Sequence, residues 1–342
     1  MKPVFRWTVG NCTDQGIEIL CESVRRAVQI YEDKFDWYIC HNNLKPKQLV
    51  DIVTMSDMFG VKMRKQSSRG LPISQSSMGS PMSGSEFDWD GSRVGGTLWK
   101  LCPPRMQYDV HEIIMDNDVI LTDKLPEIEE FLGVSDKCLI LQDNVQFYGN
   151  FANYVESEVP LNTGLIGLPP HYYFADDISD MYYQVQSDNS HHDFSCLSQA
   201  DEQGMIAAII SKKDHIVIKN DVVVELLGRT SEQRYAGRGG SGTTKKHLTS
   251  YRRFCESIFS PRRKGYHFCQ ANRIETHFAW ELYKKFQESG AGILASFGNR
   301  EAERIARRGY VEGCLGSKSL AKNWSETYAE RRLAMAKSEL DG

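Results

Sequence analysis

Residues 111–123 read HEIIMDNDVILTD, a short apolar run that leads directly into the acidic tripeptide 116–118. The apolar run predicts a buried β-strand, and the tripeptide predicts a turn at its carboxyl end. Side chains two positions apart on a strand point to opposite faces of a sheet, so Asp116 and Asp118 can reach one ligand only if the backbone turns just after Met115. A polar turn without any ligand is the alternative interpretation.

Two carboxylates at the end of a strand are suited to bind a divalent cation. Carboxylate oxygens are hard ligands, which favours Mg²⁺ or Mn²⁺ over Zn²⁺. Water and phosphate oxygens can occupy the remaining positions around such an ion. We therefore predict that Asp116 and Asp118 bind the ion, with Asp118 as the more direct ligand.

Strands and helices alternate on both sides of this stretch. Strands are predicted at residues 4–12 and 36–43, and each is followed by a helical pattern of apolar residues. Further along, the sequence predicts a short helix at 124–133, strands at 138–144 and 161–170, a helix at 201–210 and a strand at 216–226. This alternation predicts an α/β fold with an open, mostly parallel sheet flanked by helices.

Two long segments differ in composition from the rest of the chain. Residues 66–93 are predicted to be a flexible loop, because positions 67–92 contain nine Ser, four Gly and two Pro. Residues 229–264 contain ten Lys or Arg against two Glu, which predicts a mobile basic loop. The expected organisation is a catalytic core at 1–228, this basic loop, and a C-terminal segment at 265–342 that completes the site and ends in amphipathic helices.

The overall composition excludes several classes of protein. A chain of 342 residues with 41% hydrophobic residues can bury a substantial core. A net charge of -4 and a pI near 6.2 argue against a nucleic-acid binder. Nine cysteines without a C-x-x-C pair argue against a disulfide framework and a cysteine zinc site, and favour the reducing cytoplasm. No stretch approaches the roughly 18 apolar residues of a membrane span, so at most peripheral membrane contact is expected.

Four motifs occur in an informative order. The acidic tripeptide and its trailing short helix come first, and LNTGLIGLP at 161–169 follows. DEQ at 201–203 opens a predicted helix, and GYHFCQANR at 265–273 contains a late histidine. In this order the motifs, over residues 4 to about 273, resemble nucleotide-sugar-dependent glycosyltransferases of the GT-A fold, most closely the family 8 type.

This resemblance implies a GT-A-like sheet with a DxD motif and a helical C-terminal extension. It implies a metal-dependent, hexosyltransferase-like enzyme that moves a sugar from a nucleotide-diphosphate sugar to an acceptor hydroxyl. The expected donor is a UDP-sugar with Mn²⁺ or Mg²⁺, and the expected acceptor is a glycan, a lipid-linked molecule or a protein. The implied metal ligands are Asp116, Asp118 and His267. The implied catalytic residues are Asp201, Glu202 and Asn162. The implied donor-binding residues are Gly10, Asn11, Asn42, Lys100, Asp116, Gly164 and His267.

The chemistry of such a transfer requires this kind of site. Breaking a sugar–phosphate bond leaves negative charge on the diphosphate, which a divalent cation stabilises. Ligands of open α/β sheets bind at the carboxyl ends of the strands. Residues 10–11, 42–43 and 116–118 are all predicted to lie at such ends, so we expect one nucleotide site assembled from three strand ends.

Other segments fit known sites less well. GRGGSGTT at 237–244 has Thr243 where a phosphate loop requires Lys. The run at 191–193, His-His-Asp, has no further ligand at metal spacing, and no G-x-S-x-G hydrolase motif occurs. Two alternatives stay open. A sugar-phosphate nucleotidyltransferase would need a basic, glycine-rich loop after the first strand, unlike NCTDQG at 11–16, and a non-catalytic GT-A-like binding module would lack the carboxylates.

Overall fold

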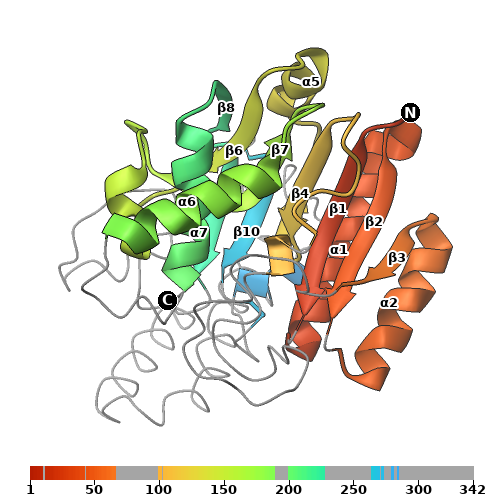
Figure 1. Cartoon of the computed structure of the whole chain (residues 1–342). Coiled ribbons are helices and arrows are strands. Elements are labelled where there is room, and N and C mark those ends of the chain that lie inside the picture. Colours follow the sequence, from red (N-terminus) through yellow and green to blue (C-terminus); the bar gives the residue numbers. More distant parts are fainter. Residues whose placement is uncertain are drawn as a thin grey trace, which may run out of the picture.

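A seven-stranded sheet forms the centre of the computed structural model (Figure 1). The structure describes residues 1–10, 12–42, 44–66, 99–101, 103–188, 199–227, 263–269, 271–272, 279–280 and 283–284. The strand order is β3-β2-β1-β4-β7-β6-β8. These strands are β1 (Val4–Gly10), β2 (Asp36–Asn42), β3 (Lys62–Lys65), β4 (Glu112–Asp116), β6 (Cys138–Gln142), β7 (Leu161–Leu168) and β8 (His215–Ile218).

Four of the six strand pairs in this sheet are parallel. The pairs β1–β2, β1–β4, β2–β3 and β6–β8 are parallel, whereas β7 is antiparallel to both β4 and β6. Long helical connections make the parallel pairs possible. The prediction of a mostly parallel sheet flanked by helices is therefore confirmed.

Helices cover both faces of the sheet. One face packs against α1 (Asp14–Tyr31), α2 (Pro46–Phe59) and α5 (Pro126–Gly133), and the other against α6 (Phe174–Asp188) and α7 (Gln199–Ser211). Short 3₁₀ turns occur at η1 (Glu32–Lys34), η2 (Trp99–Leu101) and η3 (Gly149–Tyr154). None of the helices in the described ranges is long and apolar enough to cross a membrane.

The alternation of side chains along β4 explains how one strand serves two cores. Ile113 and Met115 pack into the core on the side of α1, and Ile114 packs into the core on the side of α7. All three side chains are fully buried. A strand covered on both faces needs a continuous apolar run, which is the pattern that precedes the acidic tripeptide.

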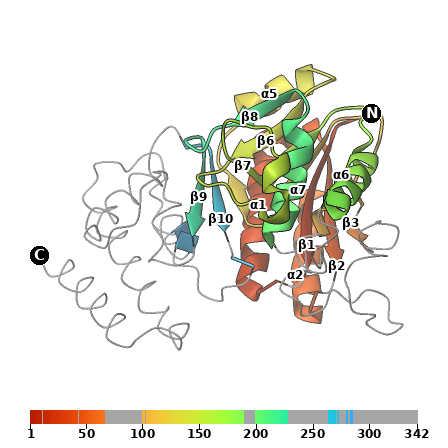
Figure 2. The ribbon, with the colours of Figure 1, turned by 60° about the vertical axis from the view of Figure 1, so that its left-hand side comes forward.

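A second, three-stranded sheet stands beside the first. It consists of β5 (Val119–Leu121), β10 (Gly265–Cys269) and β9 (Val223–Leu227), in that order. Strand β10 is antiparallel to β5 and parallel to β9, and Figure 2 shows β9 and β10 side by side. This sheet brings the late histidine segment to the strand that directly follows the acidic tripeptide.

The register of the main sheet gathers several strand ends at one edge. Gly10 pairs with Asn42, and Asp116 pairs with Thr8, so the carboxyl ends of β1, β2 and β4 coincide. Because β7 is antiparallel to β4, its first residues, beginning at Leu161, reach the same edge. Gly10, Asn42, Asp116 and the first residues of β7 therefore lie at one edge of the sheet.

Two details of the predicted elements are wrong. The predicted strand at 216–226 is divided between β8 and β9, because the Asn-Asp pair at 220–221 forms a turn in which Val222 N donates to Lys219 O at 2.9 Å. The backbone also turns one residue later than expected, since Asp116 is still paired with β1. The predicted loop at 66–93, the basic loop at 229–264 and the C-terminal amphipathic helices lie almost entirely outside the described residues.

Candidate active site

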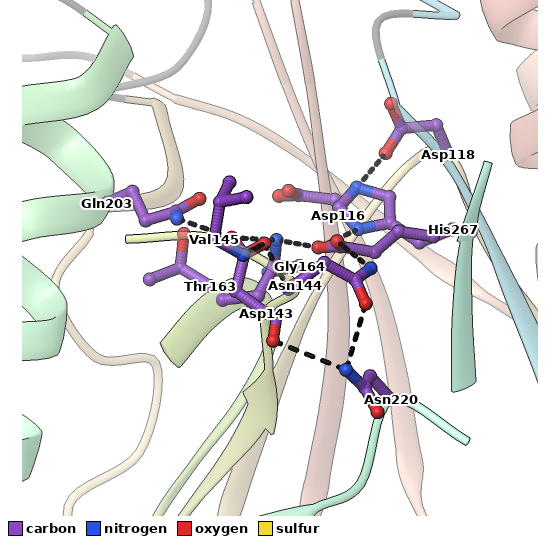
Figure 3. A network of polar contacts seen from close by, with 12 residues as sticks. Asp116, Asp118, Asp143, Asn144, Val145, Thr163, Gly164, Gln203, Asn220 and His267 are labelled. Carbon is purple, nitrogen blue, oxygen red and sulfur yellow. Dashed lines mark hydrogen bonds and ion pairs between the residues drawn. The ribbon is translucent and has the colours of Figure 1, made fainter. Parts of the chain in front are cut away.

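Asp116, Asp118 and His267 form the centre of the candidate site (Figure 3). Asp116 ends β4, Asp118 lies in the following turn, and His267 on β10 pairs with Val119. One potential ligand atom from each residue lies within 4.8 Å of those of the other two. Nε2 of His267 lies 3.3 Å from Oδ1 of Asp118. The structure thus brings together the three residues predicted to bind metal.

The burial of this cluster leaves polar atoms without partners. Asp118 is 4% exposed and His267 is 7% exposed. Among the described residues, neither Oδ1 of Asp118 nor Nδ1 of His267 has a hydrogen-bond partner. Burial alone would lower the pKa of His267, but Cys269 and Asp118 raise it well above its ordinary value. Because a buried polar atom without a partner costs about 1–3 kcal/mol, the cluster is suited to bind a further group.

Asn117 explains why the turn has this shape. Its side-chain amide donates to the carbonyl of Gly16 at 3.4 Å and to Oδ1 of Asn272 at 2.5 Å. Asn117 is buried, so the middle residue of the tripeptide points toward α1. The two carboxylates on either side of it are left to face the site.

Lys100 bridges Asp116 and Glu202. Its Nζ lies 3.0 Å from Oδ1 of Asp116 and 3.0 Å from Oε1 of Glu202. It also donates to the backbone carbonyl of Thr163 at 2.9 Å and to the Thr163 hydroxyl at 3.1 Å. Burial would lower the pKa of Lys100, but the two carboxylates raise it above its ordinary value, so the ammonium is charged. Burial raises the pKa of both carboxyls, and Lys100 opposes that shift.

A buried ion pair holds the backbone that carries Lys100. Nε of Arg6 donates to Oε1 of Glu112 at 2.7 Å, and a second guanidinium nitrogen donates to the carbonyls of Lys100 at 3.2 Å and Pro103 at 2.8 Å. The other Glu112 oxygen accepts from Met106 N at 2.7 Å. The segment before β4 is therefore fixed to the sheet by a charged pair that is itself fully buried.

The structure separates the two acidic residues at the start of α7. Glu202 reaches the site, where it contacts Lys100 and accepts from the Thr163 hydroxyl at 3.3 Å. Oδ1 of Asp201 instead accepts from Asn150 N at 2.6 Å. This bond ties α7 to η3. Glu202 is thus in contact with Lys100 and Thr163 at the centre of the site, and Asp201 is bonded to the backbone of η3.

Asn162 lies in a second polar cluster next to His267. Its amide donates to Oδ2 of Asp143 at 3.2 Å and to Oε1 of Glu225, and its oxygen accepts from Gly164 N at 2.7 Å. Both carboxylates are almost fully buried. Burial and the neighbouring Asp143 raise the pKa of Glu225 well above its ordinary value. Asn162 therefore orients the carboxylates of Asp143 and Glu225.

Asp143 and Glu225 were not identified as site residues from the sequence. Gln203 donates to Asp143 at 2.8 Å (Figure 3). Asn144 donates to Glu225 at 2.9 Å. A usable signal was present, because Glu225 is the single charged residue in the apolar run at 222–227. A lone carboxylate in a buried strand is retained only where it is paired or bound.

Two glycines and two asparagines were predicted to contact the donor, and the structure places them differently. Gly10 and Asn42 pair with each other at the edge of the sheet that carries Asp116, and the Asn42 amide donates to Gln66 O at 3.1 Å. A Cβ on Gly164 would lie 2.8 Å from Cε1 of His267, so the close approach at this glycine is to the imidazole. Asn11 lies outside the described residues.

Comparison with known proteins gives weak similarities only. No protein-family model and no curated protein sequence matches the chain. Among solved structures, the galactosyltransferase LgtC, in complex with donor and acceptor sugar analogs, is 12% identical with a TM-score of 0.49, over 84% of this chain and 96% of that one. The bifunctional glycosyltransferase WbbM is 10% identical with a TM-score of 0.48, over 78% and 46%. Mouse xyloside xylosyltransferase 1 is 11% identical with a TM-score of 0.45, over 80% and 100%. Similarities this low assign no activity to this chain.

Proposed function

We propose that the protein is a metal-dependent glycosyltransferase, GT-A-like and closest to the family 8 type. It would move a sugar from a nucleotide-diphosphate sugar to an acceptor hydroxyl. The observation that carries this proposal is the cluster of Asp116, Asp118 and His267 at the sheet edge where β1, β2 and β4 end. Nucleotides bind at this kind of edge in open α/β sheets.

The residues of the cluster fit a divalent cation. The Asp118 oxygen nearest His267 is buried and has no hydrogen-bond partner in the described part of the chain. The side chain of Asp116 is 24% exposed, which leaves one side open to an incoming ligand. Two carboxylates and one imidazole leave further positions of an octahedral ion for phosphate oxygens. The imidazole favours Mn²⁺, with Mg²⁺ as the alternative.

The chain's own residues would orient the reacting groups. Once bound, the cation would stabilise the negative charge that develops on the diphosphate as the sugar–phosphate bond breaks. Lys100 keeps Asp116 and Glu202 in fixed positions through contacts of 3.0 Å to each. The buried pair of Arg6 and Glu112 fixes the backbone of Lys100 in turn. Such preorganisation is a major source of rate enhancement in enzymes.

The donor would lie along the ends of the first two strands. Gly10, Asn11 and Asn42 are the proposed contacts to the nucleotide, and we propose that it is a UDP-sugar. Lys100 and Gly164 are the proposed contacts nearer the sugar. The position of Gly10 and Asn42 at the edge that carries Asp116 supports this assignment.

Glu202 is the proposed residue on the acceptor side. It is buried and reaches the cluster through Lys100, and its raised pKa makes it a possible proton carrier. Asp201 and Asn162 complete the proposed catalytic set. Their contacts with Asn150, Asp143 and Glu225 favour positioning roles for these two residues.

The proposed setting is the cytoplasm, with a glycan, a lipid-linked molecule or a protein as acceptor. The cysteine pattern of the sequence, with nine cysteines and no C-x-x-C pair, supports a reducing compartment. Peripheral contact with a membrane is compatible with a lipid-linked acceptor.

The test is a panel of UDP-, GDP-, CMP- and dTDP-sugars with Mn²⁺, in which release of the free nucleotide is measured with and without sugar acceptors. Thermal shifts run in parallel, since a ligand at 100 times its Kd adds about 2.7 kcal/mol of stability. Mn²⁺-dependent release of one nucleotide is the expected result. Release of pyrophosphate from a nucleoside triphosphate and a sugar phosphate would indicate a nucleotidyltransferase, and a thermal shift without release would indicate a binding module.

A further inference from the structure

His267 has a second side that the proposed transfer reaction does not use. Strands β9 and β10 are parallel, and their register pairs Glu225 directly with His267. Cys269 lies two residues further along β10, so its side chain is on the same face of the sheet as that of His267. Potential ligand atoms of Glu225, His267 and Cys269 lie within 4.8 Å of one another. The small sheet thus presents a carboxylate, an imidazole and a thiol together.

The Nδ1 atom of His267 faces this group. It lies 4.0 Å from Oε1 of Glu225 and has no hydrogen-bond partner among the described residues, although the side chain is only 9% exposed. The ring is confined by Gly164, where a Cβ would lie 2.8 Å from Cε1 and 2.9 Å from Nδ1. Nε2 faces Asp118, so the ring stands between two sets of ligand atoms.

We propose that Glu225, Nδ1 of His267 and Cys269 bind a zinc ion, separately from the carboxylates of Asp116 and Asp118. Thiolate, imidazole and carboxylate are common zinc ligands, with bonds of about 2.3, 2.0 and 2.1 Å. Such bonds place neighbouring ligand atoms roughly 3.3–3.6 Å apart in a tetrahedron. The ligand atoms, which all lie within 4.8 Å of one another, would therefore approach each other by up to about 1.5 Å on binding zinc. The thiolate separates this site from the first, whose two carboxylates favour harder ions.

The charges around Glu225 also favour a cation. Asp143 and Glu225 are 3% and 1% exposed, and the Asn162 amide donates to both. An amide satisfies hydrogen bonds but does not neutralise charge. A dication at Glu225 would stabilise the ionised form of these buried carboxyls, which the amides alone do not.

The shared imidazole connects the two sites. A neutral imidazole offers one nitrogen to a metal and carries its proton on the other. Zinc at Nδ1 would therefore withdraw His267 from an ion held by Asp118. Zinc is expected to weaken the binding of Mn²⁺ at the first site.

Cobalt titration of the metal-free full-length protein tests the proposal, because Co²⁺ replaces Zn²⁺ and a cobalt–thiolate bond absorbs in the near ultraviolet. The band should appear with one equivalent of Co²⁺ and disappear when Zn²⁺ is added. Cys269→Ser should remove it, whereas Asp118→Ala and Cys138→Ser should keep it. Glu225→Gln should weaken Zn²⁺ affinity about tenfold or more.

A band that persists in Cys269→Ser, or one lost in Asp118→Ala, would overturn the zinc site. If Cys269→Ser does not fold, the affinity of Glu225→Gln decides, and an unchanged value counts against the site. Electron paramagnetic resonance of Mn²⁺ should show weaker binding when Zn²⁺ is present, and no such loss in Cys269→Ser. All of these measurements detect bound metal, so they stand or fall independently of the transfer reaction.

Discussion

Nε2 of His267 lies 3.3 Å from Oδ1 of Asp118, although the two residues come from distant parts of the sequence. The contact follows from backbone pairing, because β5 begins directly after the turn and pairs with β10. Phe268 N donates to the carbonyl of Asp118 at 2.7 Å and continues that pairing into the turn. The imidazole and the carboxylate are therefore positioned together, and a change that displaces one should affect the other.

Replacing Lys100 by Met should destabilise the fold strongly. Asp116 and Glu202 would lose the ammonium that lies 3.0 Å from each, and breaking a buried ion pair typically costs about 3–5 kcal/mol. Chemical denaturation of the metal-free protein measures the loss. Lys62→Met is the matched control, since it breaks an exposed pair with Asp36 and should cost about 1 kcal/mol or less. Equal losses of stability in the two variants would show that the contacts of Lys100 with Asp116 and Glu202 do not stabilise the fold.

Gly164→Ala should displace the imidazole of His267. The added Cβ would lie 2.8 Å from Cε1 of the ring and 2.9 Å from Oδ1 of Asn162, and such overpacking costs about 1–3 kcal/mol. Mn²⁺ affinity should fall with stability. Gly133→Ala is the control, because its Cβ would meet nothing within 4 Å. Unchanged Mn²⁺ affinity in Gly164→Ala would contradict the close packing of Gly164 against the imidazole of His267.

Glu202→Gln and Asp201→Asn should have different effects. Glu202 contacts Lys100, and if it acts as a base for the acceptor, kcat of the folded Glu202→Gln protein should fall by about 100-fold or more. Oδ1 of Asp201 accepts from Asn150 N, so Asp201→Asn should lower thermal stability and change kcat much less. A large fall in kcat in Asp201→Asn, with kcat of Glu202→Gln nearly unchanged, would instead indicate Asp201 as the base for the acceptor.

Acidification should destabilise the protein through His111. Burial and Arg105 lower the pKa of His111, although the carbonyl of Val134, 2.6 Å from Nε2, opposes this. The unfolded chain therefore binds a proton near pH 6.5 while the folded chain does not, so stability falls as the pH drops from about 6.5 toward the lower pKa of the folded protein. Denaturation measured at several pH values should show a smaller fall in His111→Gln. If the free energy of unfolding depended on pH in the same way in both proteins, His111 would not be the cause of the acid destabilisation.

Local patterns in the sequence were sufficient to predict most of the fold. The apolar run before Asp116 forms a strand covered on both faces, and Gly60, with a φ of +65°, ends α2. The division of residues 216–226 was missed because the apolar residues on either side of the turn continue in a single pattern. Only tertiary pairing assigns β8 to one sheet and β9 to the other.

The candidate site was less predictable, because it depends on register between distant strands. The position of His267 beside Asp118 requires the pairing of β5 with β10, which no local pattern contains. Likewise, the network of Asp143 and Glu225 forms only when the end of β6, the start of β7 and the middle of β9 lie near one another. A lone glutamate in an apolar run was visible in the sequence, but its partners were not.

Mn²⁺-dependent donor binding by Asp118→Ala tests the central proposal most directly. Calorimetric titration with UDP-sugars and Mn²⁺ should show binding in the unaltered protein and in Asp123→Ala, whose exposed carboxylate lies nearby in sequence. Asp118→Ala should remain folded, as judged by circular dichroism, and should lose the Mn²⁺-dependent binding. Binding and turnover of the donor at nearly the original level in folded Asp118→Ala would contradict the proposed cation site and the function argued from it.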